Sequence, residues 1–178
     1  ANFEYEIDTM DIEAKGSTSD SRYGLVAIDT FTKFAEVIPI KNRTPESIIA
    51  GLKKIIAEMG KPKQLYSDEE SSVKSAKMVE FLNRTEIKSV QTSTHAHTVE
   101  RFIRTFKDNL YRRLDALKQD KKYWFRHIDN IIRKLTSQLN QWMQRIELQL
   151  QTNEEKFHMY TKKIYSIDNY SSGSKKNH

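Results

Sequence analysis

The chain has 178 residues, of which 37% are hydrophobic and 30% are charged, and it contains no cysteine. This length suits one domain with an appendage rather than two full domains. The lack of cysteine excludes disulfide bonds, a cysteine nucleophile and zinc sites built on thiolates. No stretch approaches the roughly 20 apolar residues that a membrane-spanning helix needs, which excludes a transmembrane protein.

Positive charge is concentrated after Glu100. The formal net charge is +6, but residues 1–100 carry 13 basic and 16 acidic side chains, whereas residues 101–178 carry 17 basic and 8 acidic ones. A basic segment is typical of proteins that bind a polyanion, most often nucleic acid. A solvated, lysine-rich surface explains the same counts equally well, so charge alone leaves both interpretations open.

The first part of the chain alternates between expected strands and helices. Residues 3–10 predict a strand because apolar and acidic side chains alternate, and a polar turn follows at 11–21. Further strands are expected at 23–31, 34–40, 63–67 and 87–91, and helices at 45–59 and 73–83. Thr44 is the expected N-cap of the first helix, Pro45 its first residue and Gly60 its end. This order predicts an α/β fold with a mixed sheet and helices on its faces.

The rest of the chain has helical periodicity. From Thr98, apolar residues recur every three or four positions to Leu117, which predicts one helix with a single apolar stripe. A second helix is expected from Lys122, with a seam from Phe125 to Ile146 that would pack either on the core or on a second subunit. We therefore expect a core domain at 1–134, a helical extension at 135–168 and a polar, disordered tail at 169–178.

Three acidic residues are candidates for one site. Asp8 lies in the first expected strand, Asp68 directly follows the strand at 63–67, and Glu100 lies in the first turn of the long helix. Two strand-borne carboxylates and one helix-borne carboxylate can converge at the edge of a sheet, where they would favour Mg²⁺ or Mn²⁺. Taken singly, each is also explained as an ordinary turn or surface residue.

Polar side chains continue along the helix beside Glu100. Arg104, Lys107 and Tyr111 lie within about 40° of Glu100 on the helical wheel. The two cations could hold substrate phosphates next to a bound metal. An ordinary stabilising pair between Glu100 and Arg104, four residues apart, is the alternative, and the two interpretations are compatible.

Five blocks of this sequence carry a family resemblance. They are Glu6-Ile7-Asp8-Thr9-Met10-Asp11, Tyr23-Gly24-Leu25-Val26-Ala27-Ile28-Asp29-Thr30-Phe31-Thr32-Lys33, Val37-Ile38-Pro39-Ile40-Lys41, Leu65-Tyr66-Ser67-Asp68 and Val99-Glu100-Arg101-Phe102-Ile103-Arg104-Thr105-Phe106-Lys107. Together the blocks resemble the catalytic core of retroviral-type DDE integrases, and they are most similar to the integrases of Polinton/Maverick transposons and virophages. The resemblance covers about residues 3–134.

The resemblance implies a ribonuclease H-like fold, with a five-stranded mixed sheet flanked by helices. The helical periodicity adds a long C-terminal helical extension, in which the sequence departs from the family. It implies that Asp8, Asp68 and Glu100 are the catalytic residues and bind Mg²⁺ or Mn²⁺, with Asp8 shared between two ions. Asp29 is interpreted as structural. The DNA-binding residues are expected to be Arg104, Lys107, Tyr111, Lys118, Lys121 and Lys122, with Arg126 adding phosphate affinity.

The implied function is a DNA integrase or transposase core, a polynucleotidyl transferase that processes DNA 3′ ends and transfers them to target DNA. A homo-oligomer acting in the nucleus of a eukaryotic host or in a viral particle, without a membrane, is expected. Glu69-Glu70-Ser71-Ser72 replaces the glycine and aromatic residue that usually follow the second acid, and 31 residues separate Asp68 from Glu100, fewer than usual. These departures motivate the alternative of an inactive DNA-binding or oligomerisation module. A third interpretation is a ribonuclease H that cleaves the RNA of RNA–DNA hybrids, because such an enzyme would have the same fold.

Overall fold

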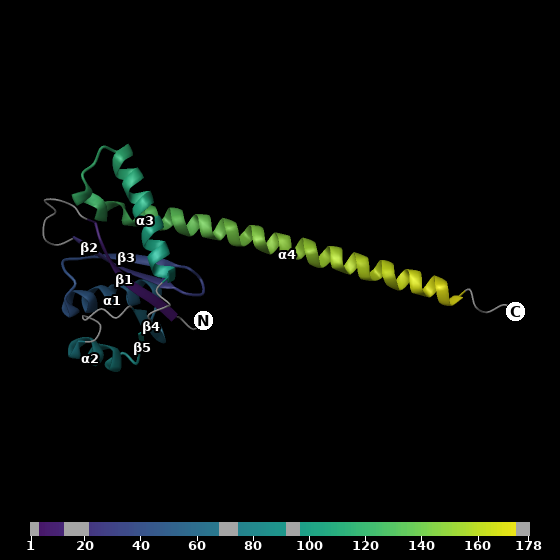
Figure 1. Ribbon diagram of the computed structural model, residues 1–178, viewed down its shortest axis with the longest axis horizontal. Coiled ribbons are helices and arrows are strands. Elements are labelled where there is room, and N and C mark those ends of the chain that lie inside the picture. Colours follow the sequence, from purple (N-terminus) through teal and green to yellow (C-terminus); the bar gives the residue numbers. More distant parts are fainter. Residues whose placement is uncertain (1–3, 13–21, 68–74, 92–96, 174–178) are drawn as a thin grey trace. The chain divides into compact units, whose positions relative to one another are not determined.

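A computed structural model describes residues 4–12, 22–67, 75–91 and 97–173 of the chain (Figure 1). The strands and helices follow one another along the chain in nearly the expected order. They are β1 (Glu4–Asp11), β2 (Tyr23–Asp29), β3 (Ala35–Ile40), α1 (Pro45–Met59), β4 (Gln64–Ser67), α2 (Ala76–Arg84), β5 (Lys88–Gln91), α3 (His97–Ala116), the 3₁₀ helix η1 (Lys121–His127) and α4 (Ile128–Gly173).

The strands form one five-stranded mixed sheet in the order β3-β2-β1-β4-β5, which confirms the predicted fold class. β1 lies at the centre, antiparallel to β2 and parallel to β4. Pro39 lies inside β3, opposite Gly24. Proline is tolerated there because β3 is an edge strand, where a missing N–H leaves no partner unbonded.

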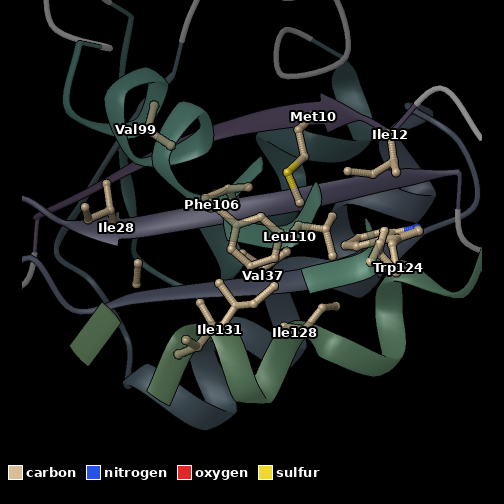
Figure 2. Packing of buried hydrophobic residues seen from close by; sticks show 14 residues of the cluster. Met10, Ile12, Ile28, Val37, Val99, Phe106, Leu110, Trp124, Ile128 and Ile131 are labelled. Atoms are coloured by element: carbon tan, nitrogen blue, oxygen red, sulfur yellow. The ribbon is translucent and has the colours of Figure 1, made fainter. Parts of the chain in front are cut away.

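Helices cover both faces of the sheet. α1 and α2 pack on the face that carries Tyr5 and Ile7 of β1. The opposite face carries Met10 and is covered by α3, η1 and the beginning of α4, as Figure 2 shows. Successive side chains of a strand point to opposite faces, so Glu6 and Asp8 share the α3 face with Met10. The candidate acids of β1 therefore face the helix that carries Glu100.

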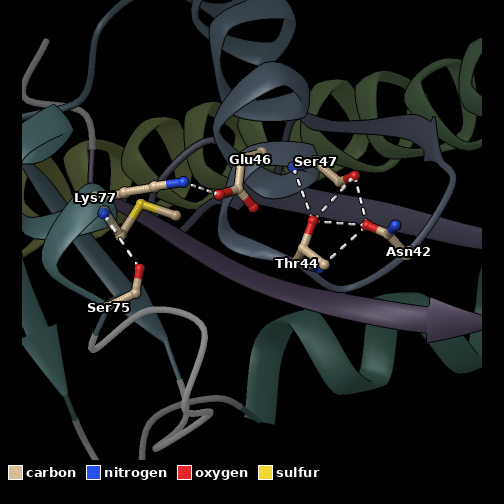
Figure 3. A network of polar contacts seen from close by, with 7 residues as sticks. Asn42, Thr44, Glu46, Ser47, Ser75 and Lys77 are labelled. Carbon is tan, nitrogen blue, oxygen red and sulfur yellow. Dashed lines mark hydrogen bonds and ion pairs between the residues drawn. The ribbon is translucent and has the colours of Figure 1, made fainter.

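The beginnings of α1 and α2 are held by the network in Figure 3. The Thr44 side chain accepts a hydrogen bond from Ser47 N–H, which confirms the predicted N-cap, and Gly60 ends α1 with a positive φ of 91°. The Lys77 ammonium pairs with the Glu46 carboxylate, which links α2 to α1 and lowers the pKa of Glu46 below its ordinary value. Ser75 caps α2 in the same way as Thr44 caps α1.

The predicted start of a regular helix at Lys122 is wrong. Residues 121–127 form the 3₁₀ helix η1, and α4 begins only at Ile128. Side chains three residues apart lie on the same side of a 3₁₀ helix. This places Trp124 and His127 together on the buried side, while Phe125, expected in the seam, is exposed. Burial of the tryptophan explains the local change in helix type.

The predicted seam divides between two environments. Ile128 and Ile132 are buried in the core and Leu135 packs against it, whereas Trp142 is exposed. The chain correspondingly divides into two compact units, Ala1–Thr136 and Ser137–His178.

α4 continues to Gly173, so residues 169–173 are helical where the sequence indicated a disordered tail. These residues include no proline, and polar residues weaken a helix without ending it. Within the part of the chain that is described, no helix is both long and apolar enough to cross a membrane.

Candidate functional site

Asp8 lies near the carboxyl end of β1, in the central part of the sheet. It is partly buried, and its Oδ1 accepts a hydrogen bond of 2.6 Å from Thr9 N–H. Its neighbour across the antiparallel pair is Val26 of β2. On the other side, the preceding residue Ile7 is in register with Ser67, the last residue of β4. Asp8 therefore projects from a fixed strand, on the face that α3 covers.

Glu6 joins this strand to the beginning of α3. Its side chain is only 6% exposed, and its Oε2 accepts hydrogen bonds from Thr98 N–H at 3.0 Å and Val99 N–H at 2.9 Å. The first N–H groups of a helix have no partner within the helix, and a carboxylate there also benefits from the helix dipole. Glu6 thus acts as a cap supplied by a residue more than 90 positions earlier in the chain.

Glu100 directly follows this capped turn. Its side chain is 51% exposed, and its Oε2 lies 3.8 Å from His97 Nδ1. The expected pair with Arg104 is not found among the described residues. Side chains of a helix point toward its beginning, which brings Glu100 toward His97 rather than toward the following turn. Glu100 therefore stays accessible beside the contact that links α3 to the strand of Asp8.

The third candidate, Asp68, lies outside the described residues. Asp68 is bonded to Ser67, whose partner Ile7 is bonded to Asp8. Within the described ranges, no group of three or more His, Asp and Glu residues is arranged to hold a metal ion. The structure thus connects the elements that carry Asp8 and Glu100, and the assignment of all three acids stays a prediction.

Cations and aromatic rings continue from Glu100 toward η1. Arg104 is exposed and Lys107 partly exposed on α3. The Lys121 Nζ lies 4.6 Å from the centre of the Tyr111 ring, a cation–π contact between η1 and α3. The Tyr123 ring is contacted in turn by Lys122 and Arg126. These residues form a basic surface with interleaved aromatic rings.

Comparison with known protein families identifies the core. The sequence matches the model of the integrase core domain over residues 2–97, which is more than half of the chain. The chain belongs to the integrase core domain family. The matched range includes Asp8 and Asp68 but ends three residues before Glu100. The assignment of Glu100 therefore depends on the resemblance of the sequence block at 99–107. No curated protein matches the chain.

Solved structures show the same fold as this integrase core. The HTLV-2 integrase catalytic core domain, in complex with magnesium, is 23% identical in its trimeric form, with a TM-score of 0.57 over 75% of this chain and 81% of that one. Its dimeric form gives 23% identity, a TM-score of 0.58, and coverage of 76% and 83%. A simian T-cell lymphotropic virus intasome, in complex with the PP2A regulatory subunit B56 gamma, gives 19% identity and a TM-score of 0.63 over 76% of this chain and 47% of that one.

Lys118 of the integrase core occupies a position that normally favours glycine. It has a φ of 51°, directly after α3, where its N–H donates to Asp115 O and Gln119 N–H donates to Leu114 O. This pair of hydrogen bonds is the Schellman motif, in which a left-handed residue ends the helix. A side chain in this conformation costs about 1–2 kcal/mol relative to the right-handed region.

Replacing Lys118 by glycine is therefore expected to stabilise the protein by roughly 0.5–1 kcal/mol, because part of that cost is offset by the flexibility of glycine in the unfolded chain. Chemical denaturation measures this change. If Lys118 also contacts DNA, the variant will bind DNA more weakly and with a salt slope reduced by about one phosphate contact. An unchanged slope would remove Lys118 from the DNA-binding set.

His127 ties η1 to the end of α3 and was missed in the sequence. It is buried, its Nδ1 accepts a hydrogen bond of 3.1 Å from Arg113 Nε, and its Nε2 lies 2.6 Å from Gln119 Oε1. Because arginine can only donate, the neutral ring carries its proton on Nε2 and donates it to Gln119. Burial lowers the pKa of His127 below its ordinary value, and the nearby charges of Arg113 and Arg126 lower it further.

Stability is accordingly expected to fall on acidification. The unfolded chain takes up a proton on His127 near pH 6.5, whereas the folded protein resists protonation until a lower pH. The contribution of His127 is complete above about pH 6.5 and is lost as the pH falls through the lowered pKa. Denaturation of the wild type and of His127→Gln at pH 7 and pH 5 tests this. The wild type should lose more stability than the variant, and equal losses would contradict the assignment.

Proposed function

We propose that this integrase core is a divalent-metal-dependent polynucleotidyl transferase that processes DNA 3′ ends and joins them to target DNA. The observation that carries the proposal is the contact between Glu6 and the first turn of α3. It holds the helix of Glu100 against β1, and Asp8 lies two residues farther along the same face of that strand. The register of β1 with β4 supports the inclusion of Asp68, because Ile7 pairs with Ser67.

The donor set fits the implied metal. Carboxylate oxygens are hard ligands, which Mg²⁺ and Mn²⁺ prefer, and neither Asp8 nor Glu100 is fully buried. When bound, the ions would activate a water or a 3′-hydroxyl and stabilise the departing oxygen of a phosphodiester. In this proposal Asp8, Asp68 and Glu100 hold the ions.

The remaining functional side chains would bind the DNA. Arg104 and Lys107 follow Glu100 along α3, so they are suited to hold phosphates of the DNA end next to the acids. The surface with Tyr111, Lys118, Lys121, Lys122 and Arg126 would add phosphate contacts that do not depend on base sequence. DNA binding should therefore weaken steeply with salt.

The proposal also covers the oligomeric state of the protein, the group of integrases to which it belongs and its location. The solved relatives include dimeric and trimeric forms and an intasome, which supports a homo-oligomer that acts on DNA ends and target DNA. The sequence blocks around Asp8, Asp68 and Glu100 support an affiliation with Polinton/Maverick transposons or virophages. An enzyme of this kind would meet its target DNA in the nucleus of a eukaryotic host, or travel in a viral particle.

A strand-transfer assay tests the function without knowledge of the end sequence. Short DNA duplexes with randomised ends are incubated with the protein, a supercoiled plasmid and Mg²⁺ or Mn²⁺, and the junctions are sequenced. Metal-dependent joining of 3′ ends supports the proposal. DNA binding without joining, and without stabilisation by the metal in thermal unfolding, would favour the inactive module. Cleavage of RNA–DNA hybrids without joining would favour a ribonuclease H.

A further inference from the structure

The second half of α4 exposes large apolar side chains. In the unit Ser137–His178, every described residue belongs to this helix. Met143, Leu150 and Phe157 are 51%, 59% and 70% exposed. Apolar side chains that are exposed to water do not stabilise the helix that carries them. Most of the stability of a helix in a protein comes from packing of its apolar face. The exposed side chains therefore indicate a surface that is covered by another molecule.

The spacing of these residues identifies the kind of partner. From Leu139, apolar residues recur in steps of four and three, through Met143, Ile146 and Leu150, with Asn153 at the next position and Phe157 after it. The same steps continue in the sequence through Tyr160, Ile164 and Ile167. A sustained repeat of seven residues keeps one stripe facing a neighbouring helix that supercoils around it, which is the pattern of a coiled coil.

We propose that this stripe, residues 139–157, pairs with the same stripe of a second copy of the chain to form a parallel coiled coil. It shares Leu139 and Ile146 with the seam at 125–146, but it continues beyond that seam through Leu150 and Phe157. The inference concerns assembly alone and does not depend on catalysis.

The charges that flank the stripe favour parallel pairing. In the heptad with Met143 and Leu150 at a, and Ile146 and Asn153 at d, the e positions hold Glu147 and Glu154. An antiparallel pair would bring e against e, and thus glutamate against glutamate. A parallel pair brings e against g, where the residues are Trp142, Gln149 and Lys156, so no two like charges meet.

Asn153 gives the parallel pair a register. It is the one polar residue at a core position between Leu139 and Phe157. In a parallel pair of identical chains in register, each Asn153 lies opposite its own counterpart, and the two amides can bond to each other because each has a donor and an acceptor. A shift of the register would place each amide against an apolar side chain. The amide therefore lowers stability relative to an apolar residue, but it favours the register in which the two amides meet.

Single-cysteine cross-linking of the full chain tests the proposal. The chain has no cysteine, so one introduced thiol reports only on its own position. In a parallel pair in register, Met143→Cys and Leu150→Cys each place two thiols across the stripe, within disulfide reach. Leu148→Cys is the matched control, since it is equally exposed but lies about 200° around the helix from position 150. All three positions are on the surface, so the core should fold in each variant.

Mild oxidation should convert M143C and L150C to covalent dimers with a yield at least about tenfold above that of L148C, because pairing raises the effective thiol concentration. Cross-linking at only one of positions 143 and 150 would overturn parallel pairing, since an antiparallel pair meets itself at one point. No cross-linking, or equal cross-linking at all three positions, would overturn the coiled coil. Dimerisation of the core through another surface would not produce strong cross-linking at positions 143 and 150 together with weak cross-linking at position 148.

Discussion

Replacing Asp8 or Asp68 by asparagine is expected to reduce metal-dependent strand transfer by more than about 100-fold while the protein stays folded. Asparagine is nearly isosteric with aspartate but removes the negative charge that holds a divalent cation. Changes to the outer-shell partners of a metal already cost about 10–100-fold, so loss of a direct ligand should cost at least as much. The assay is the joining of DNA duplexes to a plasmid, with wild type and variants at equal concentration.

Asp11→Asn is the matched control for this prediction. Asp11 ends the same strand, but its Oδ2 pairs with Arg22 at a distance of 3.3 Å on the exposed surface. This variant should join DNA at nearly the wild-type rate. Metal-induced stabilisation in thermal unfolding gives a second readout, which should disappear in Asp8→Asn and persist in Asp11→Asn. Full activity of Asp8→Asn would show that its carboxylate does not hold the metal, whereas loss of activity in all variants would indicate general damage.

Much of the fold was predictable because local signals agreed with the tertiary structure. Thr44, Pro45 and Gly60 bound a helix by backbone chemistry that does not depend on the rest of the protein, and the structure confirms them. Asp29 was interpreted as structural, and its Oδ1 accepts hydrogen bonds from Phe31 and Thr32 N–H in the turn after β2. The 3₁₀ helix at 121–127 was not predictable in this way, because the burial of Trp124 against the core overrides the helical periodicity of the segment.

The candidate site was harder to predict than the fold, because it depends on contacts between residues that are far apart in the sequence. The alternation of β1 correctly separated Glu6 and Asp8 from Tyr5 and Ile7, but it did not predict that Glu6 is buried. Glu6 is buried because α3 covers that face of the sheet, and its partners Thr98 and Val99 are more than 90 residues away. No local pattern reveals a cap supplied from such a distance. The one available signal was that Glu6 belongs to the same sequence block as Asp8.

Replacing Glu6 by alanine is expected to destabilise the protein by about 2–3 kcal/mol. The substitution removes the acceptor for two N–H groups, one of which belongs to the buried residue Val99, and burying unsatisfied donors costs free energy of this order. Glu6→Gln keeps a carbonyl acceptor but loses the charge at the beginning of the helix, and should cost roughly 1 kcal/mol. Glu4→Ala is the control, because Glu4 lies on the same strand and face but is partly exposed, and its cost should stay within about 0.5 kcal/mol.

Replacing Glu6 is also expected to reduce activity, and this effect distinguishes a role in positioning Glu100 from a role in stability alone. At a temperature where Glu6→Ala remains folded, the beginning of α3 is no longer fixed to β1, so Glu100 loses its position relative to Asp8. Strand transfer should then fall more than DNA binding, because the basic surface from Arg104 to Arg126 lies beyond the first turn of α3. Glu6→Gln should recover part of both stability and joining, since it restores an acceptor for the helix. If Glu6→Ala unfolded no more easily than Glu4→Ala, the capping contact could not be what holds the two elements of the site together.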